Sequence, residues 1–213
     1  MTQRSAASFR RGPSKYNTQA RVLVLCEDSK SSKIYLEDAS RHFRATTKVE
    51  IAHPNCTDPL GIVNAAVRQQ GNFDVVYCVV DRDTHANWDR AINMAHGHSK
   101  VKLVRSFPCF EFWLLLHFEY TRAGYARAGK DSAAAQVVRD LKKKPGMSKY
   151  DKGSIEGLFG SLCGESEDIL TTACDRGDRT LHEAAQDGEP NPSTEMQILI
   201  RVLRKLGRPV PVR

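Results

Sequence analysis

Asp74-Val-Val-Tyr-Cys-Val-Val-Asp-Arg-Asp83 is the stretch that decides the fold. It carries the strongest strand signal in the chain, a continuous apolar run rich in valine, which is typical of a strand in a parallel sheet. The run ends in Asp81-Arg82-Asp83. If the backbone stays extended for two more residues, both aspartates lie on one face and Arg82 on the other. The stretch therefore predicts a strand with paired carboxylates at its carboxyl end.

Strands and helices alternate on both sides of this stretch. Further strands are predicted at residues 21–26, 47–52 and 100–106, and helices at residues 29–43, 58–70, 88–95 and 108–118. The last of these helices is apolar almost all round, which is typical of a buried helix. The alternation of strands with helices predicts an α/β fold with a mostly parallel sheet of about four strands and right-handed crossovers.

The remainder of the chain is predicted to be helical and more polar. Helices are expected at residues 132–143, 155–162 and 165–175 and from Ser193 onward, with a long loop at residues 177–192. The hydrophobic content of 40% is enough to bury one substantial core. We therefore expect a basic arm at residues 1–20, an α/β core at 21–130 and a helical extension at 131–213 packed on that core.

The net charge of +7 is unevenly distributed along the chain. The first 21 residues contain five basic residues and no acid, and a second concentration comprises Lys142, Lys143, Lys144, Lys149 and Lys152. Such patches attract polyanions and favour nucleic acid, DNA or RNA, as a partner. For the arm, a disordered tail that only aids solvation is an equally good interpretation.

The cysteines and the apolar runs indicate the cellular compartment in which the protein is expected. The six cysteines include no CxxC pair, so they are interpreted as small buried side chains in a reducing compartment rather than as a zinc site. No window approaches the roughly 18 consecutive apolar residues of a membrane span, and the first residues lack the apolar stretch of a signal peptide. We expect a soluble cytoplasmic protein with no membrane partner.

Three acidic residues, Glu27, Asp81 and Asp83, follow two of the predicted strands. Ligand sites of open α/β sheets lie outside the carboxyl ends of the strands, where the direction of winding switches. Clustered carboxylates repel one another, and a bound cation relieves that repulsion. Their hard oxygens suit Mg²⁺ or Mn²⁺, ions that polarise a phosphodiester and activate water. The simpler alternative is that each acid only caps the helix after it.

Other polar residues near this edge are candidates for supporting roles. Candidate phosphate-binding residues flank the acids in sequence: Lys30, Lys33, Arg82 and Arg90. Arg82 could instead form a salt bridge that orients an aspartate. His85 is a candidate ligand or proton carrier, or a simple turn residue. Glu111 lies on the apolar helix, where a buried acid needs a partner or a metal, so it is a possible supporting residue of the site.

Four segments of the chain resemble the RloB family. They are Val22-Leu-Val-Leu-Cys-Glu27, Val79-Val-Asp-Arg-Asp83, Ser106-Phe-Pro-Cys-Phe-Glu-Phe-Trp-Leu-Leu-Leu-His-Phe118 and Asn191-Pro-Ser-Thr194, in that order. The resemblance covers roughly residues 15–206, and the third segment is its most specific part. The family is similar in turn to Toprim-fold proteins, which carry a Glu after the first strand and an Asp-x-Asp after a later one. The resemblance implies Glu27 as a ligand or general acid/base, and Asp81 and Asp83 as the metal-binding pair.

The resemblance also implies a cellular setting, and the chain departs from the family pattern at two positions. Family members occur in bacterial or archaeal defence loci near restriction or CRISPR systems, often beside a partner ATPase. The usual Glu-Gly turn is Glu27-Asp28 in this chain, and the glycine of the broader Toprim pattern is Ala86. Neither departure removes a carboxylate, but an altered turn can change the geometry of a metal site.

Three functions are consistent with this sequence. The leading hypothesis is a metal-dependent nuclease in which Asp81 and Asp83 hold Mg²⁺, Glu27 assists with metal or proton transfer, and nearby basic residues bind the phosphate backbone. The second is a module that binds nucleic acid or a partner protein and whose acidic cluster is not catalytic. The third is a metal-dependent enzyme acting on nucleotides or on a small phosphorylated signal.

Overall fold

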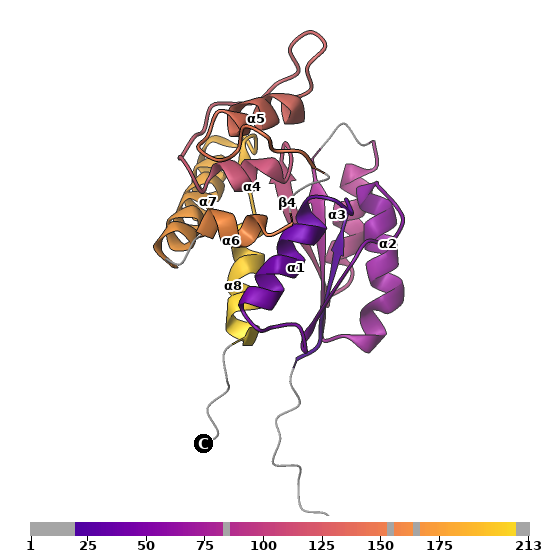
Figure 1. The fold of residues 1–213 in the computed structure, drawn as a ribbon. Coiled ribbons are helices and arrows are strands. Elements are labelled where there is room, and N and C mark those ends of the chain that lie inside the picture. Colours follow the sequence, from indigo (N-terminus) through magenta and orange to yellow (C-terminus); the bar gives the residue numbers. More distant parts are fainter. Residues whose placement is uncertain (1–19, 83–85, 153–155, 164–166, 208–213) are drawn as a thin grey trace, which may run out of the picture.

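A computed structural model describes residues 20–82, 86–152, 156–163 and 167–207 (Figure 1). Its five strands form one sheet in the order β2-β1-β3-β4-β5: β1 Val22–Cys26, β2 Val49–Ala52, β3 Val75–Asp81, β4 Val101–Phe107 and β5 Ser193–Thr194. The first four strands are parallel, which confirms the predicted α/β sheet. The winding reverses at β1, because β2 lies on one side of it and β3 on the other.

The fifth strand was not expected. Residues 193 and 194 were predicted to begin the last helix, but they pair antiparallel with Phe107 and Ser106 of β4. The hydroxyl groups of Ser106 and Thr194 are hydrogen-bonded at 3.0 Å. A two-residue strand is too short to show alternation in a sequence, so only its pairing with β4 defines it.

Eight α-helices flank the sheet in the part of the chain that the structure describes: α1 Ser32–His42, α2 Pro59–Gln69, α3 Trp88–His96, α4 Glu111–Leu115, α5 Ala133–Lys142, α6 Leu158–Cys163, α7 Glu167–Asp187 and α8 Met196–Gly207. A short 3₁₀ turn, η2 Gln70–Asn72, follows α2. The predicted helix at 108–118 is therefore shorter than expected, although Phe112, Trp113 and Leu114 are completely buried as predicted.

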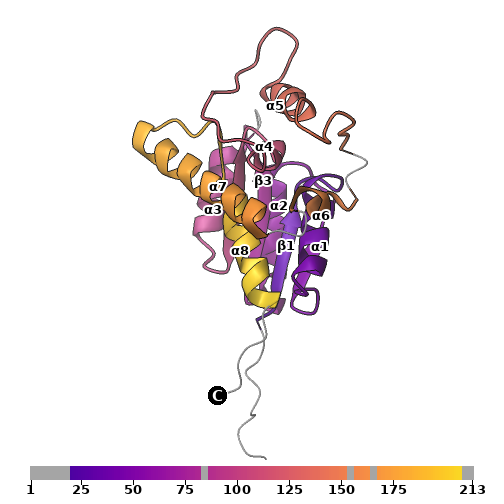
Figure 2. The ribbon, with the colours of Figure 1, turned by 60° about the vertical axis from the view of Figure 1, so that its left-hand side comes forward.

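The helices cover the two faces of the sheet unequally (Figures 1 and 2). Successive residues of β1 separate the faces, because Val22 and Val24 belong to one hydrophobic cluster and Leu23 and Leu25 to another. The second cluster is closed by α2 and α3. The first and larger cluster contains residues of α1, α4, α5, α6, α7 and α8, so the helical extension shares a core with the α/β part.

The predicted loop at residues 177–192 is wrong for most of its length, because α7 continues to Asp187. Gly177 suggested a break in the helix, but its role is packing. A Cβ built at Gly177 would lie 2.7 Å from Oε1 of Gln197 in α8, so the glycine permits close approach of the two helices. A glycine that serves packing has the same sequence signal as one that ends a helix.

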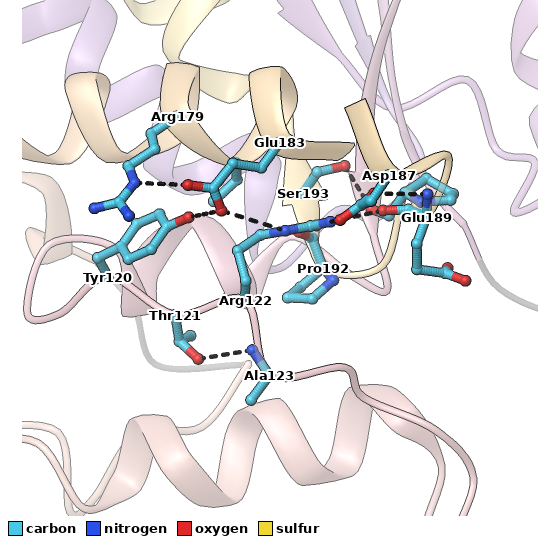
Figure 3. Close-up of polar contacts among 12 residues, drawn as sticks. Tyr120, Thr121, Arg122, Ala123, Arg179, Glu183, Asp187, Glu189, Pro192 and Ser193 are labelled. Carbon is cyan, nitrogen blue, oxygen red and sulfur yellow. Dashed lines mark hydrogen bonds and ion pairs between the residues drawn. The ribbon is translucent and has the colours of Figure 1, made fainter. Parts of the chain in front are cut away.

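The carboxyl end of α7 is fixed by residues that follow α4 (Figure 3). The Arg122 guanidinium donates to the Asp187 carboxylate at 2.7 Å and to the carbonyl oxygens of Glu189 and Pro192 at 2.9 and 2.5 Å. The Tyr120 hydroxyl donates to Glu183. These contacts tie side chains of the last turns of α7, and the carbonyl groups of the segment that follows it, to the chain after α4.

The structure describes the state of the cysteines and the lengths of the helices. All six cysteines are free, and five of them are buried, which confirms the interpretation as small core residues for these five but not for the partly buried Cys56. Within the described ranges, no helix has the length and apolar character needed to cross a membrane.

Candidate functional site

The four parallel strands each deliver a polar side chain near the carboxyl edge of the sheet. Asp81 is the last residue of β3, Glu27 directly follows β1, His53 directly follows β2, and Glu111 begins α4 after the turn that leaves β4. Because β1, β3 and β4 are neighbours in the sheet, their three carboxylates are brought to one edge. The sequence-based placement of Glu27 and Asp81 at adjacent strand ends is confirmed by this topology.

Glu27 is held against β3 by a direct hydrogen bond. Its Oε2 accepts from the backbone N–H of Asp81 at 2.8 Å, and its own N–H donates to the carbonyl of Val79 at 3.0 Å. On the other side of β1, Nδ1 of His53 lies 3.0 Å from the carbonyl oxygen of Cys26. The Glu27 carboxylate is therefore oriented toward the end of β3.

The Asp81 carboxylate lies in an unfavourable environment for a negative charge. Burial raises its pKa well above the ordinary range, and the nearby carboxylates of Glu111 and Glu27 raise it further, while Lys152 lowers it. Each of these groups therefore lies close enough to act on Asp81. An added positive charge at this position would relieve the repulsion among the three acids.

Glu111 is completely buried and is only half satisfied by its neighbours. Its Oε1 accepts from the Tyr150 hydroxyl at 3.0 Å and pairs with the Lys152 ammonium at 3.1 Å. Its Oε2 is buried without a hydrogen-bond partner. A buried carboxylate oxygen without a partner is costly, so it marks a position that a donor or a cation can fill.

The four predicted phosphate-binding residues differ in their exposure and in the contacts that they make. Lys30 and Arg90 are exposed, at the start of the α1 region and on α3. Lys33 is paired with Glu37 at 2.6 Å. Arg82 lies on the opposite face from Asp81, as predicted, where its guanidinium stacks on Trp88 at 4.8 Å from the ring centroid. Lys30, Arg82 and Arg90 are thus all exposed, but Arg82 is stacked on Trp88, and Lys33 is partly buried in its ion pair.

The lysine-rich segment after α5 is partly neutralised by carboxylates. Lys143 pairs with Asp140 at 2.7 Å, Lys144 with Glu119 at 2.6 Å, and Lys152 with Glu111. Lys142 and Lys149 remain exposed. The patch is thus less strongly basic than its sequence suggests.

The described carboxylates provide hard oxygen ligands but not a complete metal centre. Asp83 and His85 lie outside the described residues, so the structure does not place them. Among the residues that it does describe, no group of three or more His, Cys, Asp or Glu side chains could hold a metal ion. The partnerless Oε2 of Glu111 and the crowding around Asp81 fit a divalent cation at this edge, with Asp83 as a further predicted ligand.

A comparison with protein families decides what kind of chain this is. The family model described as RloB-like protein matches residues 22–203, which is most of the sequence. The chain belongs to the RloB-like family. No curated protein and no solved structure matches it.

The departure of this RloB-like chain at Asp28 has a structural explanation. The Asp28 carboxylate accepts hydrogen bonds from the N–H groups of Lys30 and Ser31, and from the N–H and hydroxyl of Ser32 at 3.3 Å each. It therefore caps the start of α1, a role that aspartate performs well. Capping was the simpler alternative for Glu27, Asp81 and Asp83, but the capping contacts described at the start of α1 come from Asp28, for which no such role was predicted.

Sequence reasoning missed three residues around this RloB-like site: His53, Tyr150 and Lys152. Tyr150 and Glu111 are 39 residues apart, and no periodic pattern links a lysine or tyrosine in a loop to an acid in a distant helix. His53 had a usable signal, because it directly follows a predicted strand in the same way as Glu27. The signal for Lys152 was only its membership of a basic segment.

Proposed function

We propose that this RloB-like protein is a metal-dependent nuclease that cleaves phosphodiester bonds of nucleic acid. The observation that carries the proposal is the convergence of Glu27, Asp81 and Glu111 at the carboxyl edge of adjacent strands. Excess negative charge in a partly buried site is a pattern expected of a cation-binding centre, and not of a set of independent helix caps.

Each residue has a definite part in this proposal. Asp81 and the predicted ligand Asp83 would hold Mg²⁺ or Mn²⁺, which polarises the phosphodiester and lowers the pKa of bound water. Glu27, fixed by its bond to the Asp81 N–H, would orient the strand end and carry a ligand or proton-transfer role. The exposed Lys30 and Arg90 would contact the phosphate backbone of the substrate.

The family resemblance extends the proposal to a cellular setting. We propose that the protein acts in the cytoplasm in a prokaryotic anti-phage or restriction-type defence system, and that an ATPase is its partner protein. Neither DNA nor RNA is favoured by the described residues. Copurification with the product of a neighbouring ATPase gene, with and without infection, tests this setting.

The nuclease proposal is tested by cleavage assays with single- and double-stranded DNA and RNA in Mg²⁺ or Mn²⁺. Asp81→Asn should reduce cleavage by roughly a hundredfold or more, because metal-bound charge stabilisation contributes several kcal/mol and each 1.36 kcal/mol is a factor of ten. Asp74→Asn is a matched control, since Asp74 is an exposed aspartate that directly precedes the same strand, at the end opposite to Asp81. Absence of cleavage of every substrate, alone and with the partner, contradicts the proposal.

A second candidate function is a nucleic-acid-binding or partner-binding module with a non-catalytic acidic cluster. It is favoured by the described residues, which form no complete metal group, and by the Glu27 carboxylate, which is engaged with the Asp81 N–H. This function predicts salt-sensitive binding that is unchanged in Asp81→Asn. Binding that requires Asp81 and a divalent cation would exclude it.

A further inference from the structure

The ion pair between Lys152 and Glu111 joins an exposed loop to a completely buried acid. The two charged atoms are 3.1 Å apart, Glu111 has no exposed surface, and about half of the Lys152 side chain is exposed, at 48%. A buried ion pair with one exposed member is not needed to fill a core, because an apolar pair of similar size is often as stable. Packing alone therefore does not explain the ion pair between Lys152 and Glu111.

The charge balance of the site supplies that explanation. Asp81 interacts with both Glu27 and Glu111, and Lys152 is a cation that acts on both Asp81 and Glu111. Its ammonium is thus located where the repulsion among the acids is relieved. A divalent cation bound at the same edge would have the same electrostatic effect and would compete with the ammonium.

The contacts of Glu111 show how the exchange could occur. Tyr150 and Lys152 both bind Oε1, and Oε2 is buried without a partner. The hydroxyl of Tyr150 can keep hold of the carboxylate when the ammonium leaves. The exposed side chain of Lys152 can then turn to solvent at little cost, as lysine stems commonly do.

We propose that Lys152 is the built-in counterion of the acidic site, and that a divalent cation displaces it and takes Glu111 as an additional ligand. This inference rests on the cation site of the proposed function, but it does not depend on nuclease activity. Lys152 stabilises the carboxylates when no cation is bound. It lowers the affinity for the cation, and after displacement it is available to a phosphate group.

The test is Mn²⁺ binding to the full-length protein, measured by the electron paramagnetic resonance signal of free Mn²⁺ in metal-free buffer. Lys152→Met should bind Mn²⁺ about tenfold more tightly and Glu111→Gln about tenfold more weakly, within the usual range of coupling between sites. Mn²⁺ should also raise the melting temperature of Lys152→Met more than that of the unchanged protein.

A control variant separates the effect of Lys152 from that of any lysine in the same loop. Lys149→Met removes an exposed lysine from that loop. It should bind Mn²⁺ as the unchanged protein does. If Lys152→Met unfolds without Mn²⁺, Glu111→Gln decides the question alone.

The outcomes are distinguishable from those of the nuclease assay. Wild-type affinity in both Lys152→Met and Glu111→Gln would overturn the inference and leave the metal site intact, because the ion pair would then be structural only. Failure of the unchanged protein to bind Mn²⁺ at millimolar concentration would overturn the inference together with the metal site. The expected affinity shifts without any cleavage would support the inference and overturn the nuclease proposal.

Discussion

The two faces of the sheet are built from different kinds of core. The face covered by α2 and α3 is closed by an apolar cluster that includes Ile62, Val63 and Ala91. The buried polar side chains of the described residues all belong to the α1 region, β4, the α4 region, α7, β5 or α8, and none to α2 or α3. Buried polar groups are costly unless they are paired. The face opposite α2 and α3 therefore depends on specific polar contacts that the α2–α3 face does not need.

This difference indicates where function can reside. The α2–α3 face holds the sheet together by burial alone, which is not directional. The other face contains Glu111 and the chain of hydrogen bonds that joins Trp113, Tyr35 and His117. Three predictions, in order of decreasing effect, test whether the faces differ in this way.

The largest expected effect is a loss of stability at low pH through His117. Burial lowers the pKa of His117 from 6.5 to about 4, and Arg176 also lowers it. Above pH 6.5 the imidazole is neutral in both states. Below it the unfolded chain binds a proton that the folded protein excludes, so stability falls as the pH decreases toward 4. The free energy of unfolding should drop by about 2 to 3 kcal/mol between pH 7 and 4.5.

Urea unfolding at the two pH values measures this effect, with His117→Phe as the reference. Groups other than His117 titrate alike in both proteins, so the difference in pH dependence belongs to His117. An equal loss of stability in His117→Phe would show that the buried imidazole does not account for the pH dependence.

A smaller effect is expected from Tyr35→Phe, which leaves the volume of the core almost unchanged. The Tyr35 hydroxyl accepts from Nε1 of Trp113 at 2.9 Å, and both residues are completely buried. Removing it leaves the indole N–H without a partner and should cost about 2 kcal/mol. Ile62→Leu on the other face should cost less than about 1.5 kcal/mol in the same urea titration. A larger cost for Ile62→Leu would remove the distinction between the faces.

The smallest effect concerns two helical glycines. Gly177→Ala would bring a Cβ to 2.7 Å from the buried Gln197 side chain and should cost about 1 kcal/mol, because that side chain or the two helices must shift. Gly160→Ala in α6 meets no atom within 4 Å and should stabilise the protein by about 0.5 to 1 kcal/mol. Thermal unfolding of both variants measures the signs. A stabilising Gly177→Ala would show that the close approach of the helices is not needed.

The sequence was sufficient for those parts of the fold that have a periodic pattern. The valine-rich β3, the parallel order of strands and the buried segment around Trp113 follow from such patterns, as does the position of Glu27 and Asp81 at strand ends. The length of α7 and the strand β5 do not. Gly177 resembles a helix end in the sequence, and Ser193–Thr194 is defined only by its pairing with β4.

The same limit applies to the candidate site. Glu111 could be singled out because an acid in an apolar helix is unusual, whereas Lys152 and Tyr150 become relevant only when the chain folds back over α4. Lys33 and Arg82 were predicted to bind phosphates, but they contact Glu37 and Trp88 in the structure. In the folded protein, a basic residue next to an acid in the sequence also lies close to other residues. Its spacing from the acid does not show which of them it contacts.

The most direct test of the account is a crystal structure of the protein grown with Mn²⁺, with the ion located by anomalous scattering. We predict a peak at the carboxyl edge of β3, within metal–oxygen bonding distance of Asp81 and bound as well by Glu27, Asp83 or Glu111. A map without a peak at this edge, at a Mn²⁺ concentration in the millimolar range, would contradict the central claim.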